Sequence, residues 1–243
     1  MRLKTGYMRI CVFTLVAGEE YYSAVLPGLH TKHKYCKRHG YDYLEVVDHS
    51  LPQVGGLPIS WYKLHFLADI LLADTYDVIF CSDADVCITN PAIKIETILQ
   101  VHFPLGKDLL FSRQCVWAPY INAGNFFVRN TPWAQVFLRK WFQNGEKYES
   151  ENRKFWEQAY INDMYDIYAD KEVIEHVQVT CDQKLFNSFH LNWEAGDFLI
   201  HFPTLSGEHL KSAMKYGAGF VRFQKGIQEQ SWFQFKGKKE LKN

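Results

Sequence analysis

The first third of the chain alternates between short apolar runs and longer segments with helical spacing, which constrains the fold more than any other feature. Apolar runs at residues 9–16, 41–47 and 77–81 predict strands. Residues 19–39, which end before Gly40, and 61–73 predict helices. Strands that alternate with helices form parallel βαβ units, so the sequence predicts an α/β fold. Such sheets bind ligands at the carboxyl ends of their strands.

The rest of the chain continues with further strands and helices. Apolar runs predict strands at 109–112, 125–129 and 198–202, and helical spacing predicts helices at 133–142 and 155–165. Polar or Gly- and Pro-containing stretches predict loops at 49–60 and 144–154, both candidate lids, and a solvated tail at 236–243. No internal repeat or low-complexity linker divides the 243 residues, so we expect one domain over 1–243 with its core at about 9–220.

The charge balance limits the partners of this chain. Lys and Arg together number 27, as do Asp and Glu, so the formal net charge is zero. Nonspecific affinity for nucleic acid comes from clustered basic residues, so we expect no nucleic-acid partner, although a small anionic ligand is not excluded. The longest apolar runs, 10–17 and 66–73, are shorter than the ~20 residues of a membrane span.

Cysteine usage bears on the compartment. None of the six cysteines forms a Cys-x-x-Cys pair, and no Asn-x-Ser/Thr sequon has a non-proline middle residue. Buried free thiols are therefore expected rather than disulfides or zinc ligands. This pattern favours a reducing compartment and a cytoplasmic protein. The alternative is a Golgi-type lumenal domain whose stem and anchor are absent from this sequence.

An acidic pair follows the third predicted strand. In Ser82-Asp83-Ala84-Asp85, extended backbone would point both carboxylates to the same side. Two acids without a nearby Lys or Arg repel each other unless a cation lies between them, and oxygen ligands favour Mg²⁺ or Mn²⁺. Such a metal could stabilise a diphosphate leaving group. The simpler alternative is a solvated turn, because Asp-x-Asp is common.

Five motifs in a fixed order resemble nucleotide-sugar-dependent glycosyltransferases of the GT-A fold. They look most like glycosyltransferase family 34, the retaining α-galactosyl, α-mannosyl and α-xylosyl transferases, with family 8 as a near relative. The resemblance covers about residues 9–215, and its motifs are Trp61–Leu64, Ser82–Val86, Asn122–Asn130, Trp156–Gln158 and His201-Phe202.

The resemblance implies a metal-dependent enzyme with a GT-A (Rossmann-like) catalytic domain. It would move a hexosyl or pentosyl unit from a UDP- or GDP-sugar to a hydroxyl of a glycan acceptor, with retention of configuration. Asp83 and Asp85, with Ala84 between them, match the motif that binds the donor and Mn²⁺ (or Mg²⁺). His201 matches the third metal ligand. The oligomeric state is left open.

The resemblance also implies roles for other positions. Gln158 matches a catalytic residue beneath the anomeric carbon of the donor, and Glu157 matches the acid beside it. The remaining positions match donor-binding residues. Asn122 and Gly124 would line the donor sugar, Thr14 and Ala17 would lie near the base and ribose, and Lys63 would face the donor.

Two departures from the family pattern affect these roles. The family often has His-Phe-x-Gly-x-Lys, with the lysine on the diphosphate. Here His201-Phe202 continues into a longer segment, and the next lysine, Lys211, is the candidate for that contact. Before Gln158 stand Trp156 and Glu157, where the family commonly has acids.

Alternatives remain open at this point. No His or Asp stands out as a dedicated base, which favours a retaining attack from the leaving-group face; an inverting enzyme would make Glu157 the base. A haloacid-dehalogenase-type phosphohydrolase would use Asp83 as nucleophile, but Cys87 stands where that motif has Thr or Val. A non-catalytic sugar-binding module is the third reading.

The tryptophans 117, 133, 156 and 193 are expected mostly in the core, and which of them stacks on an acceptor sugar is left open.

Overall fold

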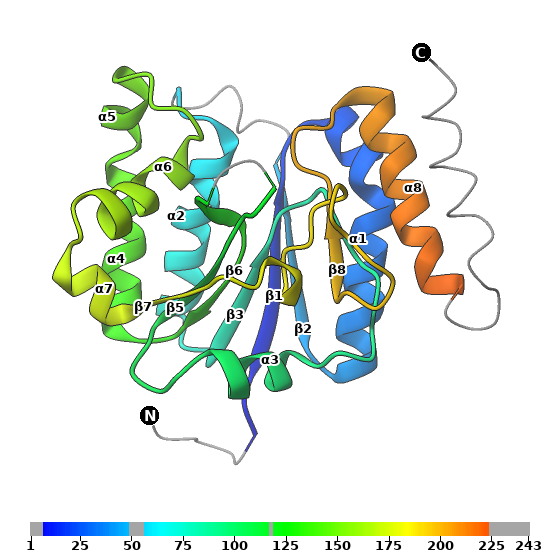
Figure 1. The fold of residues 1–243 in the computed structure, drawn as a ribbon, viewed down its shortest axis with the longest axis horizontal. Helices are drawn as coiled ribbons and strands as arrows, with labels where there is room; N and C mark the ends of the chain where they lie inside the picture. Colours follow the sequence, from blue (N-terminus) through cyan, green and yellow to red (C-terminus); the bar gives the residue numbers. More distant parts are fainter. Residues whose placement is uncertain (1–6, 49–55, 117–118, 224–243) are drawn as a thin grey trace.

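The computed structural model of the protein describes residues 7–48, 56–116 and 119–223 (Figure 1). A six-stranded sheet has the order β2-β1-β3-β6-β5-β7. Its strands are β1 (Ile10–Val16), β2 (Asp42–Val47), β3 (Val78–Ser82), β5 (Leu109–Arg113), β6 (Ile121–Arg129) and β7 (Val177–Thr180). Only β6 runs antiparallel to its neighbours β3 and β5 within this sheet. The predicted α/β fold with a mostly parallel sheet is confirmed, and the parallel βαβ pattern holds for β1, β2 and β3.

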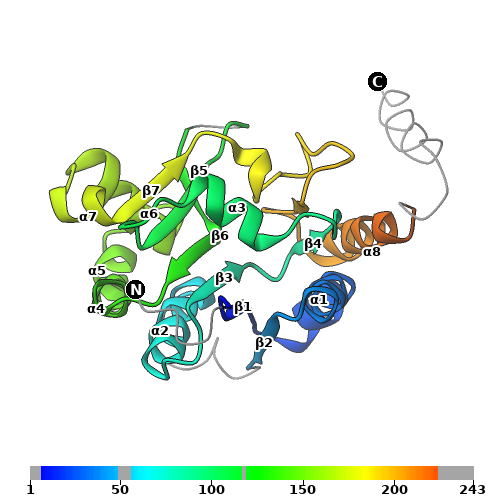
Figure 2. The same ribbon diagram turned by 90° about the horizontal axis from the view of Figure 1, so that it is seen from below.

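Helices cover both faces of the sheet (Figure 2). One face packs against α2 (Ile59–Leu72), α4 (Pro132–Gln143) and α6 (Glu157–Asn162), and the other against α1 (Glu19–His39) and α3 (Ile95–His102). Helix α8 (Gly207–Phe223) packs against α1 in a third cluster. The remaining short helices are α5 (Gly145–Ser150), α7 (Lys171–His176), the π-helical η2 (Asp163–Ile167) and the 3₁₀ turn η3 (Gln183–Leu185).

Strand β1 shows why the sheet is buried on both faces. Cys11 and Phe13 pack toward α2 and α4, whereas Ile10 and Val12 pack toward α1 and α3. All four side chains are buried. Successive residues of a strand point to opposite faces, so a near-continuous apolar run is what a strand covered on both sides requires.

A second, two-stranded sheet was not predicted. Strand β4 (Val86–Ile88) pairs antiparallel with β8 (Leu199–His201), and Val86 lies opposite His201. The prediction of a strand at 198–202 is confirmed, but its partner follows the acidic pair directly. This pairing brings two segments more than a hundred residues apart in sequence to the same end of β3.

Two predicted segments differ from the structure. Residues 144–154, expected as a loop, contain α5, and the helix expected at 155–165 begins at Glu157 and continues as the π-helical η2. Phe155 and Trp156 have φ values of 75° and 50°, which excludes them from the helix. The predicted loop at 49–60 lies outside the described residues for 49–55, and so does the tail at 236–243.

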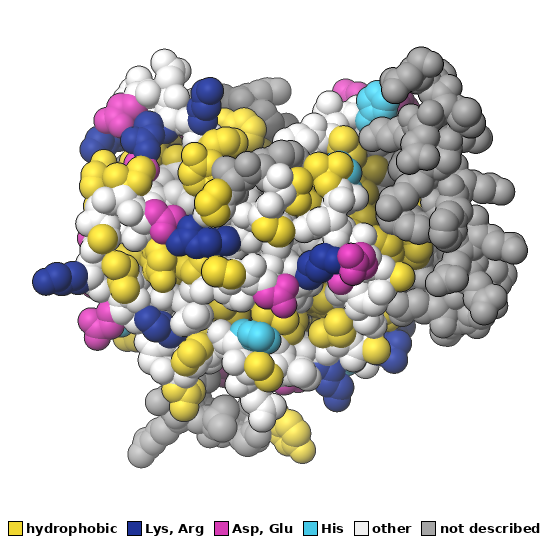
Figure 3. All heavy atoms as spheres, in the orientation of Figure 1, with side chains coloured by type: hydrophobic (Ala, Val, Ile, Leu, Met, Phe, Trp, Pro, Cys, Tyr) yellow, Lys and Arg dark blue, Asp and Glu magenta, His cyan; other side chains and the backbone are white. Residues whose placement is uncertain are grey.

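The structure also bears on the cysteines, the membrane and the charges. All six cysteines are free, and Cys115 and Cys181 are the exposed ones. Across the described residues, each helix is too short or too polar to cross a membrane. On the described part of the face in Figure 3, basic and acidic side chains are interspersed without an extended basic patch.

Candidate active site

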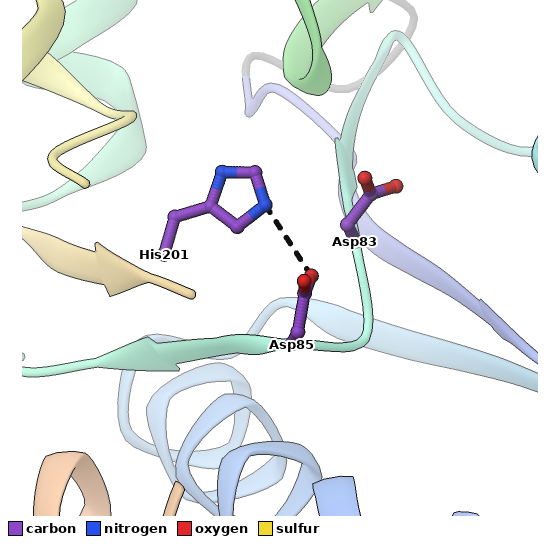
Figure 4. Close-up of side chains that lie close together, drawn as sticks. All are labelled: Asp83, Asp85 and His201. Carbon is purple, nitrogen blue, oxygen red and sulfur yellow. Dashed lines mark ion pairs between the residues drawn. The ribbon is translucent and has the colours of Figure 1, made fainter. Parts of the chain in front are cut away.

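The acidic pair lies where β3 ends and the chain turns into β4. The prediction that extended backbone aligns Asp83 and Asp85 is wrong, because the chain turns at Ala84 and Asp85. The turn is held from two sides: Asp83 N donates to Gly124 O (2.7 Å), and Phe202 N donates to Asp85 O (3.0 Å). Even so, candidate ligand atoms of Asp83, Asp85 and His201 all lie within 4.8 Å of one another (Figure 4).

A cleft of about 530 Å³ opens over this turn. It brings together all the predicted site residues except Thr14 and Lys211. Those that line it are Ala17, Lys63, Asp83, Ala84, Asp85, Asn122, Gly124, Glu157, Gln158 and His201. They come from the ends of β1, β3, β6 and β8 and from α2 and α6. The candidate site therefore lies at one end of the central sheet.

Thr14 and Lys211 lie elsewhere. Thr14 is buried, and its hydroxyl donates to Ser82 O (2.9 Å), so it ties β1 to β3, while Leu15 and Ala17 line the cleft. Lys211 lies on α8, donates to Glu208 Oε1 (3.2 Å) and lines a separate pocket. The structure thus places neither side chain against the acidic pair.

Lys63 supplies the positive charge beside Asp83 that the sequence did not reveal. Its Nζ lies 3.0 Å from Asp83 Oδ1 and 2.9 Å from Glu157 Oε1, and it donates to Ala123 O (2.8 Å). The assumption that no Lys or Arg lies near the acids is therefore wrong. Burial alone would lower the pKa of Lys63, but the two carboxylates outweigh it and raise that pKa. Lys63 is a fixed cation that joins α2, β3 and α6.

A second lysine reaches the same turn from the other face of the sheet. Lys32, on α1, is buried, and its Nζ donates to Asp83 O and to Thr14 Oγ1. Burial lowers the pKa of Lys32 to about 8, although the charges of Asp85 and Asp83 partly offset this effect. Sequence reasoning missed Lys32, because a lysine in a helix is ordinarily solvated.

Asp85 pairs with His201. His201 Nε2 lies 3.3 Å from Asp85 Oδ1, and the imidazole is buried. Burial alone would raise the pKa of Asp85, but the charge of His201, the hydrogen bond to it and the charge of Lys32 outweigh burial, so the pKa is lowered. Asp85 is therefore held as a carboxylate.

Backbone amides of β6 orient two side chains of the cleft. Gln158 Oε1 accepts from Ala123 N (3.2 Å) and from Asn122 Nδ2 (3.0 Å), while Asn122 Oδ1 accepts from Gly124 N (2.9 Å). A Cβ at Gly124 would lie 2.6 Å from His201 Cε1 and 2.8 Å from Asp83 Oδ2. A side chain at this position would therefore displace the candidate metal ligands.

Asn187 extends this chain of amides to His201, and the sequence did not reveal it. Its Nδ2 donates to Asn122 Oδ1 (2.8 Å), so its Oδ1 faces His201 Nδ1 (2.9 Å) and Asn125 Nδ2 (2.9 Å). An amide oxygen only accepts, so this network assigns the proton of neutral His201 to Nδ1. Nε2, which lies 3.3 Å from Asp85 Oδ1 and donates to it when the imidazole is protonated, would give up its proton and present its lone pair when a metal binds.

The donor set fits a small divalent cation. Two carboxylates and one imidazole suit Mn²⁺ or Mg²⁺, and ligands about 2.1 Å from such an ion lie within roughly 4.2 Å of one another. The observed limit of 4.8 Å is close to that separation. Asp83, Asp85 and His201 could therefore hold such an ion with small side-chain rotations.

Sequence comparisons identify two families. Residues 33–155 match the family described as "Protein of unknown function, DUF273", and residues 118–204 match the "galactosyl transferase GMA12/MNN10 family", which is glycosyltransferase family 34. The second match contains Asn122, Gly124, Glu157, Gln158 and His201. No curated protein matches the chain in sequence.

Solved structures of similar fold include two glycosyltransferases. One is a glycosyltransferase involved in the glycosylation of the major capsid of PBCV-1. It superposes with a TM-score of 0.71 at 13% sequence identity, and the match covers 86% of this chain and 99% of that chain. The other is GlyE of Streptococcus pneumoniae TIGR4, with a TM-score of 0.56 at 13% identity, covering 92% of this chain and 66% of that chain. These likenesses show the fold.

The family 34 match favours a transferase over the phosphohydrolase and the non-catalytic module considered above. Its span joins the lining of the cleft on β6 and α6 to His201 on β8. The chain therefore belongs to the DUF273 family and is a glycosyltransferase similar to family 34.

Proposed function

We propose that this glycosyltransferase moves a hexosyl or pentosyl unit from a UDP- or GDP-sugar to a hydroxyl of a glycan acceptor, in a metal-dependent reaction with retention of configuration. The observation that carries the proposal is the Asp83–Asp85–His201 cluster at the base of the cleft. Beside His201, the pKa of Asp85 is lowered and Asp85 is held as a carboxylate, and a metal would take the place of the Nε2 proton that pairs the two side chains.

The charges of the cleft support metal dependence. Among the described residues that line it, Lys63 is the one Lys or Arg, and its charge is already shared by Asp83 and Glu157. A departing diphosphate would therefore find no free cationic side chain there. A bound Mn²⁺ or Mg²⁺ supplies the charge that stabilises this leaving group. A contact from Lys211 remains a prediction.

The donor would extend from the β1 side of the cleft toward α6. Ligands of open α/β sheets bind outside the carboxyl ends of the strands, where Leu15, Ala17 and Tyr21 line the cleft. The base and ribose would lie there, and the sugar would lie near Asn122 and Gln158. Gln158, oriented by the β6 amides, steadies the sugar as positive charge develops at its anomeric carbon.

The carboxylates of the cleft support retention. Asp83 pairs with Lys63, Asp85 with His201, and Glu157 is buried against Lys63. Each carboxylate among the described residues lining the cleft is thus already in an ion pair, which argues against its use as the base that deprotonates an acceptor. The acceptor would therefore attack from the leaving-group face and pass its proton to a phosphate oxygen.

A thermal-shift screen of UDP- and GDP-sugars with and without Mn²⁺ tests this proposal. We expect one donor to raise the melting temperature only with the metal, and Asp85→Asn to abolish that shift. Hydrolysis of the donor then identifies the sugar, and NMR of the product reports the stereochemistry. A screen in which no nucleotide sugar shifts the melting temperature contradicts the function, and an inverted product contradicts retention.

The cysteines support a reducing compartment such as the cytoplasm rather than a Golgi-type lumen. All six are free, and four of them are buried thiols inside the fold. Burial raises the pKa of Cys11, Cys36 and Cys87 to about 12, so these groups remain protonated and unreactive at neutral pH.

A further inference from the structure

Three exposed aromatic side chains line the cleft. Tyr120, Phe155 and Trp156 have exposed fractions of 43%, 53% and 55%, and all three line the same cleft as the acidic pair. The rings of Tyr120 and Phe155 lie 5.7 Å apart between centroids, inclined by 44°. We call these three residues the aromatic lip. Large aromatic groups gathered at a cleft and left in solvent mark a binding surface.

The backbone of the lip is strained. Phe155 and Trp156 are consecutive non-glycine residues with φ of 75° and 50°, a conformation that side chains of L-residues disfavour. Their side chains are more than half exposed, so burial within this chain does not account for the strain. Strained positions of this kind concentrate where a ligand is held.

The strained pair is tied to the residue beneath the donor sugar. Gln158 N donates to Phe155 O (3.0 Å), and Ala159 N donates to Trp156 O (3.0 Å), so the pair lies directly before α6 and is hydrogen-bonded to its first turn. The conformation of Phe155 and Trp156 thereby sets where both rings lie relative to Gln158. A ligand on the lip would be held at a defined place beside the reacting centre.

The sheet order separates the lip from the expected position of the nucleotide. In the order β2-β1-β3-β6-β5-β7, strands β1 and β6 lie on opposite sides of β3. Ala17 follows β1, where the base and ribose are expected, whereas Tyr120 precedes β6. The lip is therefore on the side of the cleft away from the nucleotide, where an acceptor would approach the sugar.

We infer that the aromatic lip binds a neutral sugar ring of the acceptor glycan; this inference rests on the proposed function. The C–H face of a pyranose is apolar and fits an aromatic ring, while its hydroxyl groups remain free to contact water or the Tyr120 phenol. A neutral sugar is favoured over an anionic one because the only Lys or Arg among the described lining residues, Lys63, is already paired.

Saturation-transfer NMR tests the inference with a panel of neutral methyl pyranosides and disaccharides. The variants are Trp156→Ala and Phe155→Ala, with Tyr168→Ala as the matched control, because Tyr168 is an exposed aromatic (61%) that does not line the cleft. For a sugar that binds the natural chain, we expect Kd to rise at least about tenfold in both lip variants. The control should retain the natural affinity.

A parallel thermal-shift measurement with nucleotide sugar and Mn²⁺ separates the two proposals. Lip variants that keep the nucleotide shift but lose the glycan support the inference. Equal glycan affinity in natural and lip variants overturns it, as does a panel from which no sugar binds the natural chain. Loss of the nucleotide shift in the lip variants would assign the lip to the donor base instead. If no nucleotide sugar raises the melting temperature of the natural chain, the proposed function is contradicted. Glycan binding is measured separately by NMR, so the two failures can be told apart.

Discussion

The base of the cleft and the aromatic lip face the same space but are held in different ways. At the base, Lys63, Asn187 and His201 are buried, and each has polar partners on other elements of the fold. At the lip, Phe155 and Trp156 are more than half exposed and are set by strained local backbone. We therefore expect changes at the base to affect the stability of the fold, and changes at the lip to affect mainly ligand binding.

Among substitutions at the base of the cleft, we expect replacement of Lys63 to lower the free energy of unfolding the most. In Lys63→Met, the buried Glu157 carboxylate and Asp83 lose their cation, and removing one partner of a buried pair costs about 3–5 kcal/mol. Denaturant unfolding measures the loss.

The matched control is Lys184→Met, because Lys184 pairs with the largely exposed Glu194 and should lose at most about 1 kcal/mol. Similar losses in the two variants would show that Lys63 is not coupled to the fold as its contacts indicate.

The next effect is a pH dependence from Lys32 at the base of the cleft. Its pKa is about 8 in the folded chain against an ordinary 10.5, so between these values the unfolded chain binds more protons than the folded one. The stability contributed by Lys32 is therefore present above pH 10.5 and is lost as pH falls toward 8. The full difference corresponds to about 3 kcal/mol.

Comparing the natural chain with Lys32→Met separates the effect of Lys32 on the unfolding free energy from that of other groups that titrate in the same pH range. We expect the unfolding free energy of the natural chain to rise relative to that of the variant as pH increases from 8 to 10.5. A difference between the two proteins that stays constant across this range would show that the Lys32 pKa is ordinary.

A smaller effect is expected at Asn187, which contacts His201 at Nδ1 and lies outside the proposed metal site. Asn187→Leu removes the acceptor for His201 Nδ1–H, and loss of such a partner weakens metal binding about 10- to 100-fold. Electron paramagnetic resonance titration with Mn²⁺ measures the affinity without requiring turnover.

Two further variants show whether the effect belongs to the hydrogen bond. Asn187→Asp keeps an acceptor and should recover part of the affinity, whereas Asn192→Leu, outside this network, should bind Mn²⁺ like the natural chain. Equal affinity in Asn187→Leu and the natural chain would refute the positioning role.

At the lip we expect a smaller effect, a difference in stability between two substitutions of Trp156. With φ at 50°, Trp156→Gly should be more stable than Trp156→Ala by about 1 kcal/mol, because glycine adopts this conformation without the penalty of a Cβ. Thermal or denaturant unfolding of the two variants measures the difference.

Val136, exposed within α4, should show the opposite order, with Val136→Ala more stable than Val136→Gly by about 1 kcal/mol. If alanine is the more stable replacement at both positions, the lip is not strained.

Local sequence patterns predicted much of the first half of the fold. The strands at 9–16, 41–47 and 77–81 and the helices between them follow from apolar spacing, because that spacing reflects which faces are buried. The reversal of β6, the β4–β8 pair and α5 did not follow from it. Strand direction and partner depend on contacts between distant segments, which periodicity does not record.

Residue type and order already specify the chemistry of the candidate site: two acids after a buried strand, a late histidine, and an Asn-Ala-Gly-Asn segment before an apolar run. How these groups are held depends on the packing of distant segments in the fold. That packing placed Lys63 and Lys32 against the turn of Asp83, moved Thr14 and Lys211 away from it, and brought Asn187 to His201. Residue type and order are local properties, whereas the charge, the tautomer and the exposure of each group depend on neighbours that the fold brings from far along the chain.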